Sequence, residues 1–311
     1  MTALLDAIRS KTDRALASGD LSPLETSETV VEQNGLRFIV RWAEALARKD
    51  AAKAAAPAAA PAAAPAPAAG ADAVILPGGP RDPNFNPFLN PDPALTVGPI
   101  GTQQTIVLNK FPVCLHHLVL ARRDFAEQLT PLELCDFEVL AQLLCTLGGL
   151  GFYNGGAPAG ASQRHKHVQW VPAEPGNASL AQLAAGLPAD AQPGVVYRHP
   201  ALPMAHALLK VDVGLGADQN ASAAAMLAAY HQARADLGLV PGADGLLPSF
   251  NMLVGSGWLL LVPRSQEHFE GVSINALSFG GTIYVRQPEQ VELIRQTGPL
   301  QALGRVGRAL S

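Results

Sequence analysis

Cysteine, excess basic charge and long apolar runs are all scarce in this chain of 311 residues. Its three cysteines, Cys114, Cys135 and Cys145, lack any Cys-x-x-Cys spacing, which argues against a disulfide framework and a cysteine-rich zinc site. The net charge of −4 gives no basic surface for nucleic acid. An early acid, Asp6, and the lack of a long apolar run near the N-terminus predict neither a signal peptide nor a membrane anchor. We therefore expect a cytoplasmic protein that binds neither nucleic acid nor membranes.

Residues 51–72 are almost entirely alanine and proline, with Pro57, Pro61 and Pro65 at four-residue spacing. Proline removes helix donors and favours extended backbone, and alanine offers too little apolar area to order the segment. We interpret this segment as a surface linker. A docking motif for proline-binding modules is the alternative, but no aromatic or basic specificity residue accompanies the prolines.

The run from His165 to Val171 places two imidazoles and an amide at alternate positions of a predicted strand. Alternation puts His165, His167 and Gln169 on one face of that strand. A neutral imidazole is a good nucleophile toward phosphorus, and the phosphoramidate that it forms passes the group onward. One histidine would attack, the other would orient it, and the amide would donate to a phosphoryl oxygen. Ordinary half-buried strand residues and two ligands of a metal remain the alternatives.

Directly upstream, residues 153–163 form a stretch of small side chains that includes Gly155, Gly156 and Gly160. The backbone of such a stretch can approach a ligand closely and turn its N–H groups toward an anion. The sequence therefore predicts a phosphate-sized pocket beside a histidine nucleophile.

The remaining pattern predicts an α+β fold with an antiparallel sheet, built from two fused halves of similar element order. The length of the chain accommodates either one large domain or two fused halves. Before the first half, we expect a helix through Leu4–Leu16 and a hairpin over Thr29–Trp42 turned at Asn34-Gly35. Within the first half, we expect strands over Gln104–Leu108 and His116–Leu120 and then a helix over Thr130–Leu147. Thr130 would be the N-cap of that helix, and Glu133 would complete a capping box. Those of the second half are a strand over His206–Val213, a helix over Asp218–Leu237 and a hairpin over Ser249–Val262 turned at Gly255-Ser256-Gly257. Only the first half carries a histidine pair, which suggests a fused pseudo-dimer with one catalytic half.

The histidine segment resembles the histidine-triad superfamily, in the branch whose third histidine is replaced by glutamine. Hexose-1-phosphate uridylyltransferases and diadenosine tetraphosphate phosphorylases (ATP adenylyltransferases) share that branch. The resemblance runs from about Thr29 to Arg286 and favours the phosphorylases. The stretches that carry it are Asn86-Pro87-Phe88-Leu89, Leu108-Asn109-Lys110-Phe111-Pro112-Val113, Tyr153-Asn154, Gly160-Ala161-Ser162-Gln163 and Trp258-Leu259-Leu260-Leu261-Val262-Pro263-Arg264.

The resemblance implies a nucleotidyltransferase that cleaves diadenosine tetraphosphate (Ap4A) with phosphate, giving ATP and ADP through a covalent adenylyl-histidine. In that reaction His167 attacks, His165 supports it, and Gln169 organises phosphoryl oxygens. For Asn109, the alternative is a turn-forming asparagine without a ligand. For Lys49 and Lys110, the alternative is an ordinary solvated lysine. The substrate-binding residues that the resemblance implies are Lys49, Asn109, Lys110, Asn154, Gly160, Ala161, Ser162, Gln163, Gln169, Ser273, Ile274, Asn275, Thr282 and Arg286, the last of which stands where the family is expected to have lysine.

No metal site is expected. The uridylyltransferases bind a structural zinc through a histidine near His116-His117, the first motif histidine and a cysteine pair that this chain lacks. We expect no covalently bound cofactor, and Mg²⁺ only through substrate phosphates. The expected partners are Ap4A, ATP, ADP and phosphate, with the protein acting as a monomer. The expected domains are residues 1–50, the linker 51–72, a catalytic half 73–172, and a second half 173–311 that completes the nucleotide site.

Three other functions stay open on sequence grounds. A histidine-triad hydrolase would release AMP to water, a hexose-1-phosphate uridylyltransferase would share the mechanism, and a non-catalytic module would bind adenosine nucleotides without a covalent intermediate. Analysis of the products with and without phosphate separates these functions from phosphorolysis.

The interpretation of residues 51–72 as a linker predicts that they are dispensable. Deleting Ala54 to Ala69 and joining the ends should leave the melting temperature and turnover nearly unchanged, because the segment has little apolar surface to bury. A large loss of either quantity, measured by thermal unfolding and steady-state assay, would show that the segment packs on the protein or gates its site.

Overall fold

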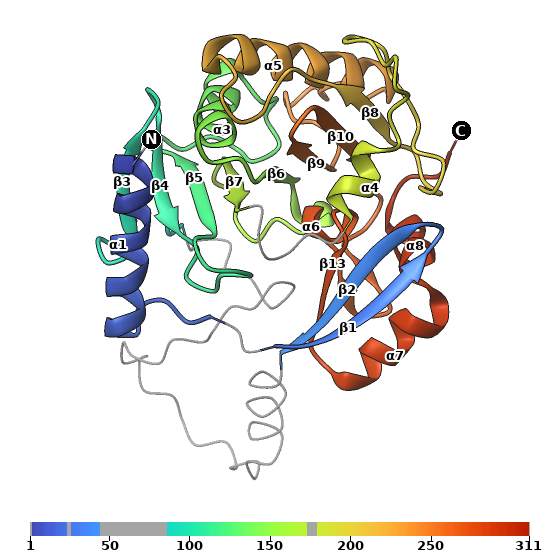
Figure 1. Cartoon of the computed structure of the whole chain (residues 1–311), viewed down its shortest axis with the longest axis horizontal. Coiled ribbons are helices and arrows are strands. Elements are labelled where there is room, and N and C mark those ends of the chain that lie inside the picture. Colours follow the sequence, from blue (N-terminus) through green and yellow to red (C-terminus); the bar gives the residue numbers. More distant parts are fainter. Residues whose placement is uncertain (1, 24–25, 44–85, 173–178, 311) are drawn as a thin grey trace.

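A computed structural model describes residues 2–23, 26–43, 86–172 and 179–310. The predicted linker 51–72 and Lys49 lie outside these residues. At the centre of the molecule is an eight-stranded antiparallel sheet with helices on one face and a smaller sheet on the other side (Figure 1). In spatial order, its strands are β3 (Thr96–Ile100), β4 (Gln104–Leu108), β5 (Leu118–Arg122), β7 (His167–Val171), β6 (Leu150–Gly155), β9 (Phe250–Gly255), β10 (Trp258–Pro263) and β8 (Ala207–Lys210).

The chain builds this sheet from two halves with the same topology. Strand β5, helix α3 (Leu134–Leu147), β6 and β7 form one unit, in which β7 lies between β5 and β6. Strand β8, helix α5 (Gln219–Asp236), β9 and β10 repeat it, with β10 between β8 and β9. The two units join where β6 pairs with β9, so that Phe152 lies opposite Leu253. The topology thus agrees with the predicted fused pseudo-dimer, and β10, the counterpart of β7, has no histidine.

A three-stranded sheet and short helices cover the other face of the large sheet. Strands β1 (Thr26–Gln33) and β2 (Leu36–Ala43) form a hairpin, and β2 pairs in parallel with β13 (Thr282–Val285). The hairpin turns at Asn34 and Gly35, both with positive φ, as predicted for an Asn-Gly turn. The remaining elements are α1 (Thr2–Ser18), η1 (Ala157–Ala159), α4 (Leu180–Ala184), β11 (His268–Phe269), β12 (Val272–Ser273), α6 (Ala276–Phe279), α7 (Pro288–Thr297) and α8 (Pro299–Val306). Within the described residues, no helix has the length and apolar character needed to cross a membrane.

Each face of the large sheet has its own hydrophobic core, and β7 contributes to both. Val168 and Trp170 pack with α3 and α5, whereas Val171 packs with the core that includes Phe38 of the small sheet. Residues at alternate positions of a strand lie on opposite faces, so His167 and Gln169 share the face of Val171. The histidine face of β7 is therefore turned toward the small sheet and the C-terminal elements.

Four predicted boundaries were wrong. Strand β7 begins at His167 rather than at His165, which forms only an isolated bridge with Glu127. Helix α3 begins at Leu134 rather than at Thr130, because Glu133 is its N-cap and forms the capping box with Asp136. The hydroxyl of Thr130 instead donates to the carbonyl of Glu127. Strand β5 begins at Leu118 because His116 has a φ of 63°, which lies outside the strand region. Strand β8 spans only Ala207–Lys210.

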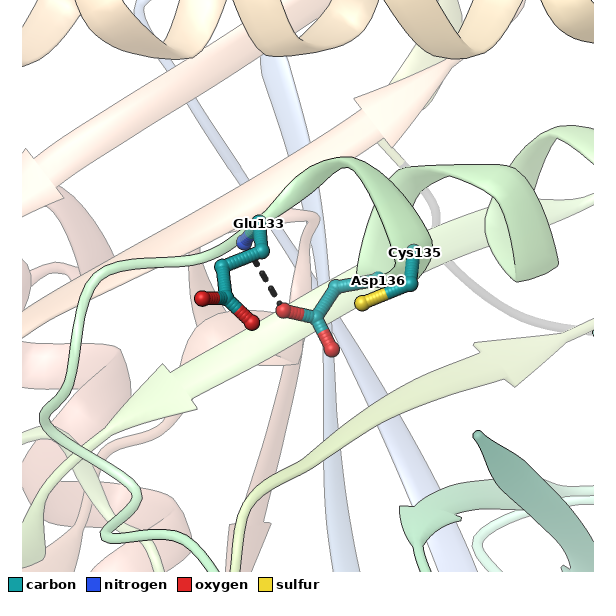
Figure 2. A group of neighbouring side chains, drawn as sticks. All are labelled: Glu133, Cys135 and Asp136. Carbon is teal, nitrogen blue, oxygen red and sulfur yellow. Dashed lines mark hydrogen bonds between the residues drawn. The ribbon is translucent and has the colours of Figure 1, made fainter. Parts of the chain in front are cut away.

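The first turn of α3 is joined to β5 by a buried ion pair. Figure 2 shows Glu133, Cys135 and Asp136 at this turn, where the backbone N–H of Glu133 donates to Asp136 Oδ2 at 2.9 Å. Arg122, at the end of β5, donates to Asp136 through Nε at 2.8 Å and Nη2 at 2.9 Å. The same guanidinium donates to the more exposed carboxylate of Glu133. The pair fixes the end of β5 against the helix.

Replacing Asp136 with asparagine should destabilise the protein by about 3 kcal/mol, because a buried guanidinium then loses its buried carboxylate. Glu133→Gln is the matched control: its side chain is 65% exposed, so its loss should cost less than about 1 kcal/mol. Denaturant unfolding of both variants measures the difference. Equal, small losses of stability would contradict the importance of the buried pair.

Candidate functional site

His167, the first residue of β7, has its ring fixed by its own chain. Its Nδ1–H donates to the backbone carbonyl of His165 at 2.8 Å. The proton therefore resides on Nδ1, and Nε2 carries a lone pair. Nε2 has no hydrogen-bond partner in the part of the chain that the structure describes. Burial lowers the pKa of His167 to about 4, so the imidazole is neutral at pH 7. A neutral imidazole with a free Nε2 is the form that acts as a nucleophile.

His165 is buried, and a backbone carbonyl holds its ring through Nε2. Its Nε2–H donates to the carbonyl of Arg122 at 2.7 Å, and its Nδ1 lies 3.1 Å from the side-chain oxygen of Asn86. Phe88 and Phe125 meet the His165 ring edge-on, with centroids at 5.8 Å and 5.6 Å. This environment suits a supporting group rather than a nucleophile. Asn86 and Phe88 come from the motif Asn86-Pro87-Phe88-Leu89, to which the sequence alone assigned no role.

Gln169 is oriented by His117, which lies directly before the neighbouring strand β5. His117 Nε2–H donates to Gln169 Oε1 at 2.9 Å, because His117 Nδ1 is occupied by the side-chain amide of Asn109 and the backbone N–H of Val113. Burial lowers the pKa of His117 to about 4, which keeps this ring neutral. With its oxygen engaged, Gln169 keeps its two N–H donors for another acceptor.

Asn154, at the end of β6, meets the second half of the chain. Its Oδ1 accepts hydrogen bonds from Asn251 Nδ2 and from the backbone N–H of Ala276, each at 2.9 Å. Its backbone carbonyl accepts from Gln128, whose side-chain oxygen accepts the N–H of His167. Asn154 is thus joined both to the nucleophile's strand and to the second half.

The small-residue loop approaches the second half closely at Gly160. This glycine has a φ of 85°, and a Cβ there would lie 2.9 Å from Asn275 Cβ and 3.1 Å from the carbonyl oxygen of Ile274. A side chain is therefore excluded by both conformation and space. The structure brings Gly160, Ile274, Asn275 and Asn154 into one region. After the glycine, Ala161 is buried, Ser162 is exposed and Gln163 is half-buried.

Four other residues that were predicted to bind substrate lie in several separate parts of the structure. Lys110 is exposed, with its Nζ 6.0 Å from the centroid of the Phe111 ring. Ser273 donates to Glu267 at 2.8 Å. Thr282 lies buried on β13, and the backbone N–H of Arg286, just after that strand, donates to Gln290. Their contacts with substrate, like that of Lys49, stay predictions.

Gln128 is a residue that sequence reasoning missed. It is 2% exposed, and its amide binds both the N–H and the C=O of His167 as well as the C=O of Asn154. Residues 126–128 lie beside the start of the histidine strand, where Glu127 forms an isolated antiparallel bridge with His165. Buried amides in loops give no periodic signal, so only the fold reveals this clamp.

Among the described residues, Glu133, Cys135 and Asp136 are the one group of three or more potential ligand atoms within 4.8 Å of one another. Figure 2 shows them at the first turn of α3, and the guanidinium of Arg122 binds both carboxylates. The two carboxylates of this group form the helix cap and the ion pair with Arg122.

The buried histidines predict a loss of stability on mild acidification. Burial lowers the pKa values of His117, His167 and His206 to about 4, whereas an unfolded histidine titrates near 6.5. Between these values the unfolded chain binds more protons, so stability rises with pH at roughly 1.4 kcal/mol per unit for each such group. Free energies of unfolding measured at pH 5.0, 5.5, 6.0 and 6.5, mostly above the titration of carboxylates, should increase steadily. A flat profile would show that these rings are hydrated or charged.

Comparison with known proteins places the chain in a family. The model described as the Ap4A phosphorylase N-terminal domain matches residues 1–72 and 77–184, and that of the ATP adenylyltransferase C-terminal domain matches residues 200–309. Diadenosine 5',5'''-P1,P4-tetraphosphate phosphorylase 2 of Saccharomyces cerevisiae is 28% identical over 234 residues, covering 67% of this chain and 70% of that protein. The same yeast's Protein APA1 is 26% identical over 230 residues, covering 66% and 70%.

Solved structures show the same fold. The crystal structure of yeast Ap4A phosphorylase Apa2 superposes with a TM-score of 0.76 at 20% identity, covering 100% of this chain and 99% of that one. Its complex with Ap4A gives a TM-score of 0.74 at 20% identity over 99% and 98% of the two chains. Because the N-terminal family model alone matches more than half of the sequence, and the C-terminal model matches most of the remainder, this chain belongs to the Ap4A phosphorylase (ATP adenylyltransferase) family.

Proposed function

We propose that this protein is a nucleotidyltransferase that cleaves Ap4A with inorganic phosphate, giving ATP and ADP through a covalent adenylyl-histidine. The observation that carries the proposal is the fixed tautomer of His167, which presents an unprotonated Nε2 at the start of β7. Family membership supplies the substrate class, since its relatives are Ap4A phosphorylases. Their activity is extended to this chain as part of the proposal.

In the first step, the Nε2 lone pair of His167 attacks the α-phosphorus of one adenosine end. A P–N bond forms as the bond from that phosphorus to the α,β-bridging oxygen breaks, and the remaining nucleoside triphosphate departs as ATP. The ring acquires positive charge, which the hydrogen bond from Nδ1–H to the carbonyl of His165 stabilises. The clamp of Gln128 on the His167 backbone limits displacement of the nucleophile.

In the second step, an oxygen of inorganic phosphate attacks the same phosphorus, the P–N bond breaks, and ADP leaves with the neutral imidazole restored. The N–H donors of Gln169 bind a non-bridging oxygen in both steps, because His117 engages the amide oxygen. The leaving groups are phosphates of low proton affinity, so a neutral amide suffices where a hydrolase would use a third histidine. Mg²⁺, where used, would bind through the substrate phosphates.

The proposal predicts one turnover without phosphate. Protein mixed with Ap4A labelled at the α-phosphates should release about one equivalent of ATP and then stall, retaining base-stable, acid-labile label on His167. Added phosphate should restart turnover, and its labelled oxygen should enter ADP but not ATP. His167→Gly should lower turnover by orders of magnitude, whereas His165 substitutions should have smaller effects. His231→Gln, at an exposed position on α5, is the matched control with wild-type turnover.

Steady release of AMP without phosphate would contradict phosphorolysis and indicate a hydrolase. Label on His165 or a serine would contradict the assignment of the nucleophile. Tight binding of AMP without any cleavage of Ap4A would indicate a binding module.

A further inference from the structure

Arg264, directly after β10, is a buried cation at the junction of the two halves. Only 4% of its surface is exposed, and all five of its N–H donors have acceptors. The ring of Phe279 lies under the guanidinium at 5.5 Å. Burial lowers the pKa of Arg264 to about 9, which still leaves it charged at pH 7. The acceptors are Asn251 Oδ1 and the backbone carbonyls of Gln266, Glu267, Ile274 and Val306.

The guanidinium fixes the orientation of the Asn251 side chain. Asn251 is fully buried on β9, and its Oδ1 faces Arg264, which supplies only donors. The amide nitrogen must then point the other way, and it donates to Asn154 Oδ1 and to the carbonyl of Ala159, both at 2.9 Å. A reversed amide would place N–H groups against a cation and an oxygen against two oxygens.

Asn251 in turn fixes the amide of Asn154. Asn154 Oδ1 accepts from Asn251 and from the N–H of Ala276, so that oxygen faces the second half. Asn154 Nδ2 finds no acceptor among the described residues and is the group left to bind a ligand. The backbone of Asn154 lies near that of His167, because the side-chain amide of Gln128 donates to both carbonyls. An amide that presents N–H donors suits an anionic phosphate, whereas a reversed amide would present lone pairs.

We infer that Arg264 and Asn251 are positioning residues that act through Asn154 to hold an amide donor toward a nucleotide phosphate beside His167. The inference rests on the proposed function for the identity of the ligand. It also explains why Arg264 binds the carbonyl of Ile274: one cation sets both the amide of Asn154 and the segment before α6 that packs against Gly160. Lysine retains the charge of Arg264 but cannot reach five acceptors in a plane.

Binding of AMP, measured by calorimetry, tests the coupling. Asn154→Ala, Asn251→Ala and Arg264→Lys should each raise the Kd by about tenfold, the scale of one lost hydrogen bond to a charged ligand. If Asn251 acts through Asn154, the double variant Asn154→Ala/Asn251→Ala should bind about as well as Asn154→Ala alone. Arg234→Lys is the matched control, because Arg234 also binds a carbonyl and lies over an aromatic ring, on α5. It should retain wild-type affinity. Multiplied losses in the double variant, or wild-type affinity in Asn251→Ala, would overturn the inference.

A second measurement needs no nucleotide and so separates this inference from the proposed function. In ligand-free protein labelled with ¹⁵N-asparagine, the side-chain amide of Asn154 should give one pair of proton signals. These signals should shift or broaden in Asn251→Ala and Arg264→Lys and stay unchanged in Arg234→Lys. Identical Asn154 signals in the wild type and Asn251→Ala would refute the positioning role, even if phosphorolysis were established. Failure of the wild type to cleave Ap4A would instead refute the proposed function.

Discussion

The hydrogen bond from His167 Nδ1–H to the carbonyl of His165 is the interaction on which the chemistry of this site depends. A neutral imidazole has one proton for two nitrogens, so the position of that proton decides which nitrogen can attack. Here the backbone carbonyl of the residue two positions earlier accepts a hydrogen bond from Nδ1–H, which keeps the proton on Nδ1 and leaves Nε2 free. The two-residue spacing of the histidines matters because the earlier residue supplies this acceptor.

The carbonyl of His165 must itself be fixed in position, and a series of hydrogen bonds restrains the segment that carries it. The ring of His165 donates to the carbonyl of Arg122, and the side chain of Arg122 is fixed by a buried ion pair with Asp136 of α3. In addition, Gln128 binds the N–H and C=O of His167. Because Arg122 is tied to Asp136, the packing of α3 also restrains the nucleophile.

Much of this arrangement was predictable from local sequence, and the rest was not. Alternation in the run 165–171 correctly predicted that His167 and Gln169 share one face, and the order of elements correctly predicted two similar halves. The predicted start of α3 was wrong because Thr130 can either cap a helix or bond within the preceding turn, and only tertiary contacts decide between the two. Asn251, Arg264 and Gln128 act through contacts between segments up to about a hundred residues apart, for which a single sequence carries no periodic or motif signal.

The tautomer of His167 tests the central claim most directly. In ligand-free protein labelled with ¹⁵N-histidine, the account predicts that at pH 7 the Nδ1 of His167 carries the proton and Nε2 shows the shift of an unprotonated nitrogen. Because burial lowers the pKa to about 4, this pattern should persist down to about pH 5. A proton on Nε2, or a doubly protonated ring at pH 7, would contradict the account, since neither form offers the lone pair at Nε2 that attack on phosphorus requires.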